Sequence, residues 1–364
     1  MISRTPARLE ERPDTGRGVP AWRRALAEAV RDPEELLGLL GLLDADSAGL
    51  PAARRAAERF PLRVPRGYVA RMRPGDPRDP LLLQVLPLDR ELEEAPGFGS
   101  DPVGDRAAAV GPGLLHKYRG RALLMVTGAC AVHCRYCFRR ELPYGELGAG
   151  PGGWDEALRR LAADPTVEEV ILSGGDPLAA SDERLAGLAA GVAAIPHVRR
   201  LRIHSRNPVV LPERVDDRLL EWLAACPLQR VVVVHANHAR EIDDAVGRAF
   251  ARLREAGATV LNQSVLLAGV NDSEEALADL SEALFEAGAL PYYLHLLDRV
   301  RGAAHFEVGE ERARRLLGRV AARLPGYLVP RLVREVAGAP AKVPLLPLLP
   351  LLPAGPPVPL RACE

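Results

Sequence analysis

Lysine is the residue that this sequence most clearly lacks. The 364-residue chain has 48 basic side chains, yet only two of them, Lys117 and Lys342, are lysine. Arginine cannot form a Schiff base, and its pKa cannot be brought near neutrality as that of an ammonium group can. A chain that uses arginine almost everywhere keeps a lysine either by chance or because an amine is required. Lys342 is therefore a candidate catalytic residue.

Cysteine is also scarce, and the five cysteines are too unevenly placed for a disulfide framework. Cys130, Cys134 and Cys137 lie within eight residues, whereas Cys226 and Cys363 stand apart. In a reducing cytosol such a cluster is more often a metal or redox site.

The sequence has no excess of charge, with 48 basic and 48 acidic residues. This balance argues against a general nucleic-acid or anionic-membrane binder. No clean apolar run is long enough to span a bilayer, and Met1–Glu10 shows no signal-peptide pattern. The uncharged tract Val343–Leu360 is broken repeatedly by proline. We expect a soluble, cytoplasmic protein with no nucleic-acid or membrane partner.

A sizeable core is available, because 48% of the residues are hydrophobic and 26% are charged. The length fits about two domains, or one large α/β barrel with additions. Residues 1–115 are expected to form a helical, loop-rich N-terminal region. Ala21–Leu43 has apolar residues at helical spacing with a break at Asp32-Pro33, and Phe60–Leu88 predicts extended segments and turns.

From Arg121 a repeated strand, loop and helix pattern predicts an α/β fold with a parallel sheet and outer helices. The simplest architecture is a partial (β/α)6 TIM-like barrel over residues 116–326, with its chemistry at the C-terminal ends of the strands. The expected strands are Ala122–Thr127, Glu169–Leu172, Arg200–His204, Arg230–His235, Thr259–Val265 and Tyr292–Leu297. The expected helices are Trp154–Ala163, Glu183–Ala194, Asp217–Ala225, Ile242–Ala256, Ser273–Ala287 and Glu310–Leu324.

Polar motifs lie at the ends of these strands, as such a barrel requires. In chain order they are Cys130, Ser173–Pro177, His204–Asn207, His235–His238, Asn262–Ser264 and Asp298.

The cysteines form a CxxxCxxC motif in the loop after the first strand. Three soft thiolates at short spacing suit an iron–sulfur cluster. A [4Fe–4S] cluster needs four ligands, so three leave one iron open to a small molecule. The alternatives are a zinc site that uses His133, or merely clustered buried cysteines. A zinc site would normally show a second paired half, and none is evident.

The CxxxCxxC loop, with Tyr136 before its last cysteine, resembles the radical S-adenosylmethionine (SAM) superfamily. Gly174-Gly175-Asp176-Pro177 after the second strand is similar to that superfamily's motif for the SAM amino group. The resemblance implies that the open iron binds SAM and that reduction releases a 5′-deoxyadenosyl radical. The residues it places against SAM are Tyr136, Ser173, Gly174, Gly175, Asp176 and Gln263.

Further motifs resemble the lysine 2,3-aminomutase family, and most closely its branch that makes β-lysine for elongation factor P. The resemblance covers nearly all of residues 20–345. The motifs that carry it are Cys137-Phe-Arg139-Arg140, Ser173–Leu178, Asn262–Leu267, Gly269–Asp272, Tyr292–Asp298 and Gly302–Phe306. Three further segments, 60–68, 112–118 and 235–243, are similar in sequence to that branch.

This family also uses pyridoxal phosphate (PLP), and this bears on the role of the two lysines. The resemblance implies that Lys342, in the segment 327–345, carries PLP. Lys117 and Arg121 would lie near the cofactor as phosphate-binding or structural cations. A lone lysine near the C-terminus is otherwise most often a solvated surface charge.

The resemblance also assigns substrate contacts. Arg139 would bind the substrate carboxylate, and Asp298 and Glu335 would face the distal ammonium of lysine. Related free-lysine enzymes usually have aspartate where Glu335 stands. The alternatives are that Arg139 is a surface charge and that Glu335 pairs with Arg331 one helical turn away.

The resulting hypothesis is an isomerase that converts L-α-lysine to (R)-β-lysine for modification of elongation factor P. It implies an electron donor such as flavodoxin, and elongation factor P or its lysine ligase as partners. Alternatives are a free-lysine aminomutase for catabolism or osmolyte synthesis, or a related aminomutase. Glutamate is disfavoured because Asp298 and Glu335 would repel it. A non-catalytic iron–sulfur or zinc protein is the alternative from another class.

The last segment, 346–364, is a Pro-Leu-Leu repeat. It is expected to be an unstructured low-complexity tail, or else a polyproline II strap against the protein or a partner. The free-lysine enzymes carry a zinc-binding, cysteine-rich extension here, whereas this sequence has only Cys363. That difference favours the elongation factor P branch.

Overall fold

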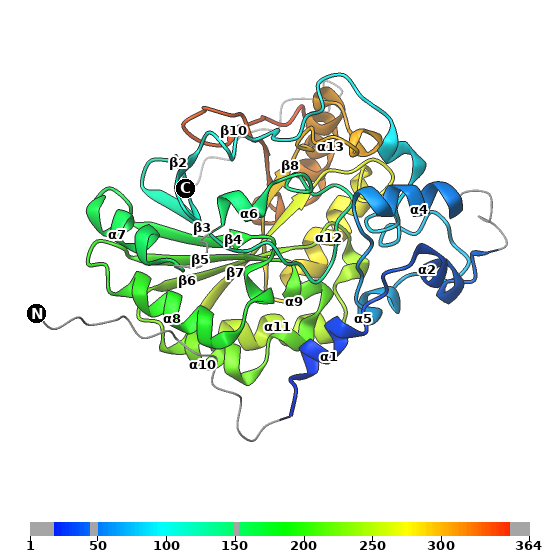
Figure 1. Ribbon diagram of the computed structural model, residues 1–364. Helices are drawn as coiled ribbons and strands as arrows, with labels where there is room; N and C mark the ends of the chain where they lie inside the picture. The colour runs from blue at the N-terminus through cyan, green and yellow to red at the C-terminus, as the bar shows by residue number, and fades with distance from the viewer. Residues whose placement is uncertain (1–17, 44–49, 149–152, 350–364) are drawn as a thin grey trace, which may run out of the picture.

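One ten-stranded sheet runs through the computed structural model, which describes residues 18–43, 50–148 and 153–349 (Figure 1). The strands lie side by side in chain order. Strands β3 to β9 are parallel to one another, whereas β1, β2 and β10 add antiparallel edges. The strands are β1 (Ala109–Gly111), β2 (Leu114–Tyr118), β3 (Arg121–Thr127), β4 (Glu169–Gly174), β5 (Arg200–Ser205), β6 (Gln229–His235), β7 (Ala258–Val265), β8 (Leu290–His295), β9 (Arg331–Arg334) and β10 (Val343–Pro344).

The six predicted strands are present as β3 to β8, with both ends within two residues of the expected positions. Strand β9 extends the parallel sheet beyond the predicted six units. It was missed because it has only four residues and carries arginine at both ends. In the described residues the two edge strands, β1 and β10, pair with β2 and β9 and not with each other. The sheet therefore does not close, and it forms an open, partial barrel. The predicted fold class is confirmed.

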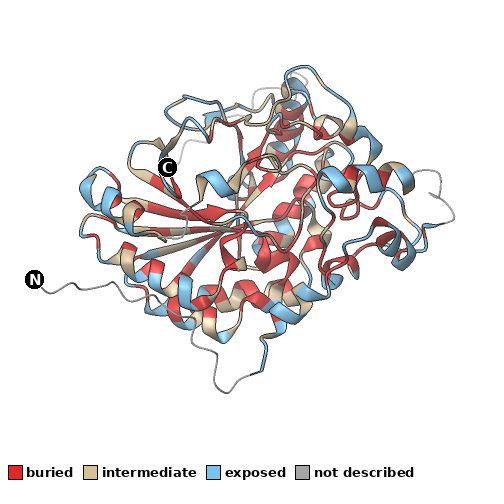
Figure 2. Ribbon diagram, viewed as in Figure 1, coloured by how far each residue is buried: buried red, intermediate tan, exposed pale blue. Residues whose placement is uncertain are grey.

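The six predicted helices are also present, and they cover the outer face of the sheet (Figure 1). Side-chain oxygens of Ser181, Asp216, Asp243 and Ser273 accept backbone N–H groups at four helix starts, which fixes where those helices begin. Buried residues concentrate along the strands and on the helix faces toward them (Figure 2). The helices are α7 (Asp155–Ala163), α8 (Asp182–Ala193), α10 (Asp217–Ala225), α11 (Asp244–Glu255), α12 (Glu274–Glu286) and α13 (Glu310–Arg323).

The N-terminal region packs beside the barrel as short helices and turns. The expected break at Asp32-Pro33 is where α2 begins, with Asp32 as its N-cap. The four-residue helix α5 lies within the stretch predicted as extended segments and turns. A buried apolar cluster joins this region to Ala131 and Val132 of the cysteine loop. The helices here are α1 (Ala21–Ala27), α2 (Pro33–Leu39), α4 (Leu50–Arg59) and α5 (Arg66–Val69).

The start of the Pro-Leu-Leu repeat lies against the protein. The Leu345 N–H donates to the Leu332 carbonyl at 2.9 Å, and the Leu348 N–H donates to the Arg314 carbonyl on α13 at 2.9 Å. Residues 345–348 are therefore a strap rather than a free tail. Residues 350–364, with Cys363, lie outside the described residues. No helix in the described ranges combines the length and apolar character needed to cross a membrane.

Candidate active site

A cavity of about 530 Å³ opens at the C-terminal ends of the parallel strands. Both lysines of the chain, Lys117 and Lys342, line it together with the three clustered cysteines. Every site residue predicted from the sequence lies on this one cavity, although the predictions came from segments far apart in the chain. They are Lys117, Arg121, Cys130, Cys134, Tyr136, Cys137, Arg139, Ser173, Gly174, Gly175, Asp176, Gln263, Asp298, Glu335 and Lys342.

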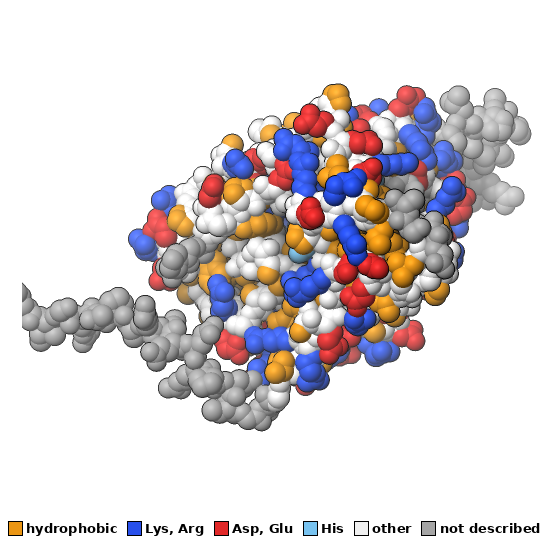
Figure 3. Space-filling model, turned by 45° about the vertical axis from the view of Figure 1, so that its right-hand side comes forward, with side chains coloured by type: hydrophobic (Ala, Val, Ile, Leu, Met, Phe, Trp, Pro, Cys, Tyr) orange, Lys and Arg blue, Asp and Glu red, His pale blue; other side chains and the backbone are white. Residues whose placement is uncertain are grey.

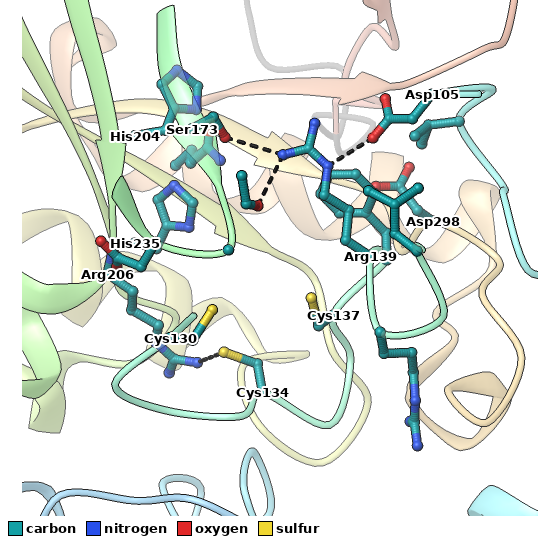
Figure 4. Close-up of a pocket in the computed structure, with 18 of the residues that line it drawn as sticks. Asp105, Cys130, Cys134, Cys137, Arg139, Ser173, His204, Arg206, His235 and Asp298 are labelled. Atoms are coloured by element: carbon teal, nitrogen blue, oxygen red, sulfur yellow. Dashed lines mark hydrogen bonds and ion pairs between the residues drawn. The ribbon is translucent and has the colours of Figure 1, made fainter. Parts of the chain in front are cut away.

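The cysteine loop follows β3 and is held by buried ion pairs. Glu91, which is 1% exposed, pairs with Arg135 and with Arg140, in both cases at 2.6 Å. The Arg135 N–H also donates to the Gln84 carbonyl at 2.9 Å. The three sulfur atoms face a common space (Figure 4). The N-terminal region thus fixes the loop from behind, while the thiols point into the cavity.

The surroundings of Cys130 and Cys137 disfavour the thiolate form of their side chains. Burial, and then the neighbouring thiolates, raise the pKa of Cys130 well above its ordinary value. The same two causes raise the pKa of Cys137 to about 11. A cationic metal centre would relieve both effects.

The thiols fit a cluster better than one zinc ion. In the described residues no three His, Cys, Asp or Glu side chains converge closely enough to hold one ion. Three soft thiolates are the donor set that would suit the irons of an iron–sulfur cluster. The Nδ1 of His133 lies 2.9 Å from the Pro61 carbonyl, to which it donates. His133 is therefore engaged with the backbone behind the loop.

Two glycines let the turn after β4 touch the cysteine loop. Gly174 has φ +126°, and a Cβ there would lie 2.4 Å from the Thr127 carbonyl oxygen. A Cβ on Gly175 would lie 2.5 Å from the Ala129 carbonyl oxygen. A side chain at either position would push the two segments apart.

The Asp176 carboxylate organises this turn from inside. It accepts hydrogen bonds from the Ser205 hydroxyl at 2.7 Å and from the Arg206 backbone N–H at 2.8 Å. Burial raises its pKa, although these hydrogen bonds oppose the shift. Its oxygens are occupied by the chain's own donors, so Asp176 shapes the cavity wall.

Arg139 is buried and ion-paired, so the surface-charge alternative is wrong. Its Nε lies 2.7 Å from Asp105 Oδ2, and its Nη1 donates to the Ser173 hydroxyl and the Gly174 carbonyl, both at 3.1 Å (Figure 4). The second Asp105 oxygen lies 2.7 Å from Lys117 Nζ. Arg139 and Lys117 outweigh burial and lower the pKa of Asp105. One carboxylate therefore holds two cations on the cavity wall.

Lys342 is ion-paired rather than a solvated surface charge. Its Nζ lies 2.5 Å from Glu335 Oε2, and the other Glu335 oxygen accepts a hydrogen bond from the Tyr118 hydroxyl at 2.6 Å. Burial opposes ionisation of Glu335, but Lys342 outweighs it and lowers the carboxyl pKa. The alternative pair of Glu335 with Arg331 is wrong, because the chain is a strand there rather than a helix.

Asp298, just after β8, has a different environment. Its carboxylate makes no hydrogen bond or ion pair within the described part of the chain. Burial raises its pKa to about 7, with Lys342 acting in the opposite direction and Glu335 adding to the shift. Gln263 on β7 also has no side-chain partner in the described ranges. Both groups line the cavity and are available to a ligand.

Arg121 has no carboxylate partner in the described residues, so its positive charge is available to a ligand. Its guanidinium carbon lies 4.6 Å from the centre of the Tyr118 ring. Since Lys117 is already paired with Asp105, Arg121 is the less committed of the two predicted anion-binding cations.

Three neutral histidines form part of the cavity wall, and none of them was assigned a role from the sequence. His204, His235 and His295, on β5, β6 and β8, line the cavity, and their buried Nε2 atoms have no partner in the described residues. Burial lowers the pKa of each imidazole, to about 3 for His235. Only His204 and His235 had a signal, since they lie in polar motifs after strands.

Asp105 and Tyr118 were likewise missed. Asp105 belongs to none of the sequence motifs, and Tyr118 ends the segment 112–118 without a role assigned to it; they reach the cavity from the N-terminal region and from β2. On the face of the molecule in Figure 3, basic and acidic side chains are interspersed over the surface.

The sequence of this chain is similar to those of several known proteins. The radical SAM superfamily model matches residues 124–281. L-lysine 2,3-aminomutase of Escherichia coli is 52% identical over 324 residues, which are 89% of this chain and 94% of that protein. The Haemophilus influenzae protein of the same name is 47% identical over 321 residues, 88% of this chain and 94% of that protein. The Clostridium subterminale protein of that name is 32% identical over 327 residues, 89% of this chain and 77% of that protein.

Proposed function

Because the chain belongs to the L-lysine 2,3-aminomutase family of radical SAM isomerases, we propose that it converts L-α-lysine to (R)-β-lysine. The observation that carries the proposal is the single cavity on which the cysteine motif, Lys342 and the unpaired Asp298 meet. The proposed cofactors are a [4Fe–4S] cluster, SAM and PLP. The proposed fate of the product is attachment to elongation factor P by a separate ligase.

Cys130, Cys134 and Cys137 are the proposed cluster ligands, and the turn at Gly174 and Gly175 borders the SAM position. Bound together, the reduced cluster and SAM supply a radical that removes an unactivated hydrogen, which no side-chain acid or base can do. Gln263 presents an unpartnered amide to a ligand, and Tyr136 closes the wall, its hydroxyl accepting a hydrogen bond from Asn237 at 2.7 Å. We include Ser173 and Asp176 in this subsite because they border it.

Lys342 is the proposed PLP-bearing residue. Glu335 Oε2 accepts a hydrogen bond from Lys342 Nζ and so positions this amino group on the cavity wall. Arg121 is suited to an anionic phosphate because it has no carboxylate partner in the described ranges. Lys117 contributes beside it while paired with Asp105. Held by these residues, PLP would supply a conjugated ring that can delocalise an unpaired electron.

Arg139 and Asp298 are the proposed substrate anchors. Arg139 uses Nε and Nη1 within the protein, which leaves Nη2 for a substrate carboxylate. The unpaired Asp298 is suited to the distal ammonium of lysine, whereas Glu335 must share its charge between that ammonium and Lys342. Two carboxylates in this part of the cavity oppose an acidic substrate such as glutamate.

The alternative of a free-lysine enzyme shares this chemistry and differs in the use of its product. A cytoplasmic location and a flavodoxin-like electron donor follow from the proposed role. The test is chiral chromatography after the anaerobically reconstituted protein has received L-lysine, SAM, PLP and a strong reductant. (R)-β-lysine is the expected product, and a Lys342→Ala control should make none. The (S) isomer would favour the free-lysine alternative. No rearrangement, with cluster and PLP both bound, would contradict the assigned substrate.

A further inference from the structure

Arg206 is a buried cation that the proposed function leaves unused. It follows β5 and is 5% exposed. Its Nη1 lies 2.7 Å from the Cys134 sulfur, to which it donates (Figure 4). In the described residues, Cys134 is the only one of the three clustered cysteines that accepts a hydrogen bond from a charged side chain.

The rest of the Arg206 side chain is fixed from behind. Its Nη2 donates to Glu241 Oε2 at 3.0 Å, to Gln84 Oε1 at 2.7 Å and to the Tyr68 hydroxyl at 3.3 Å. Glu241 is fully buried, and it also accepts the Asn237 backbone N–H at 2.8 Å. The guanidinium therefore cannot turn away from the sulfur without breaking a buried ion pair.

Arg206 also remains charged. A guanidinium stays protonated in proteins, and Arg206 is ion-paired with the buried Glu241 at 3.0 Å. Its backbone N–H donates to Asp176, so the same residue is tied to the turn beside the cysteine loop. Its position relative to Cys134 is thus set by two separate connections.

A fixed cationic donor at a cluster thiolate changes the energy of cluster reduction. The oxidised [4Fe–4S]²⁺ cluster takes one electron from an external low-potential one-electron donor and becomes [4Fe–4S]¹⁺, with no bond formed or broken. The added negative charge is shared by the sulfur ligands, so an N–H donor stabilises the reduced form more than the oxidised form. Such a donor raises the reduction potential.

We propose that Arg206 raises the reduction potential of the cluster through its hydrogen bond to Cys134. The inference rests on the proposed function, because it requires the cluster at these three cysteines. Arg206 acts through Cys134 and is therefore a positioning and tuning residue. It makes electron entry easier before SAM reacts.

The test is a redox titration of the reconstituted full chain, followed by electron paramagnetic resonance without SAM or lysine. In Arg206→Gln the ratio of reduced to oxidised cluster at a fixed potential should fall about tenfold. For a one-electron couple this corresponds to a midpoint potential about 59 mV lower. The matched control is Arg214→Gln, which removes an equally buried arginine paired with Asp182 at 2.7 Å and not lining the cavity. Its cluster should keep the wild-type potential.

Arg206→Gln leaves Glu241 buried without its cation, so a second variant guards against misfolding. The double variant Arg206→Gln, Glu241→Gln removes both charges and should show the same lower potential. Arg206→Lys keeps the charge but cannot reach Cys134, Gln84 and Glu241 together, so its potential should lie in between. A folded double variant that binds iron and sulfide normally and titrates at the wild-type potential would overturn the inference. Absence of a cluster from the wild-type protein would overturn the proposed function instead.

Discussion

At the cysteine end of the cavity, the side chains of Arg135, Arg140 and Arg206 are buried and paired with carboxylates. At the lysine end, formed by Lys117, Tyr118, Asp298, Glu335 and Lys342, one carboxyl is unpaired in the described residues. Glu91 holds two arginines behind the thiols, and Glu241 holds Arg206. Asp298 has no partner in the described residues, and its pKa is raised to about 7 by burial. Breaking a buried pair is costly, whereas an unpaired buried group favours a ligand that satisfies it.

The two ends of the cavity therefore have different expected tasks. The cysteine end is held by buried ion pairs, as a cluster that must keep one geometry requires. The lysine end has charges that can be redistributed between Lys342 and an incoming ammonium group. Changes at the cysteine end should therefore remove cofactor binding, whereas most changes at the lysine end should alter affinity and pH dependence.

The largest effect is expected from Cys137→Ser. A serine hydroxyl is a poor ligand for cluster iron, so the variant should lose the cluster and all rearrangement activity. Lys342 belongs to the other end and should still bind PLP. Iron and sulfide analysis beside the PLP absorbance checks both statements. A cluster of unchanged iron content in this variant would remove Cys137 from the ligand set.

Gly174→Ala should have the next largest effect. The new Cβ would meet the Thr127 carbonyl oxygen, and the residue would have to keep a positive φ. We expect unfolding to become easier by about 1–3 kcal/mol and SAM binding to weaken. Gly187→Ala is the control, because Gly187 lies within α8 and a Cβ there has no neighbour within 4 Å. Denaturant titration and SAM binding should separate the two variants, and equal behaviour would argue against the close contact.

Asp298→Asn should weaken substrate binding without removing any of the three proposed cofactors. We expect KM for lysine to rise about tenfold, which corresponds to about 1.4 kcal/mol. Asp298 has a pKa raised to about 7, so in the wild-type enzyme its attraction for an ammonium group is present above pH 7 and is lost as the pH falls through 7. The KM of the wild-type enzyme should rise below pH 7, and the variant should lack that rise. Identical pH profiles would exclude Asp298 as the ammonium site.

Lys117→Arg should have the smallest effect. An arginine can keep the ion pair with Asp105 and can bind a phosphate, so kcat/KM should fall less than about tenfold. Lys342→Arg, the matched change at the other lysine, should abolish activity because a guanidinium cannot hold PLP covalently. Steady-state kinetics of both variants test this contrast. Equal losses would mean that the two lysines had been assigned wrongly.

The sequence was sufficient to predict the six parallel strands and their helices, and the family resemblance supplied the site residues that lie together on the cavity. Strand-end motifs such as Cys130–Cys137 carry their own local pattern, because each follows one strand. Asp105, Tyr118 and His295 could not be assigned in this way, since their roles depend on contacts between segments distant in the chain. Strand β9 was missed for a related reason: it is stabilised by pairing with β8 and β10 rather than by its own composition.

In the proposed function, the two lysines on one cavity have different tasks. The most direct measurement is borohydride reduction of the PLP-loaded full chain, followed by peptide mass spectrometry. Because the chain has only two lysines, the labelled peptide identifies the residue without ambiguity. We predict the pyridoxyl label on Lys342 and none on Lys117. A label on Lys117, or bound PLP that borohydride attaches to neither lysine, would contradict the assignment of Lys342 as the PLP-bearing residue.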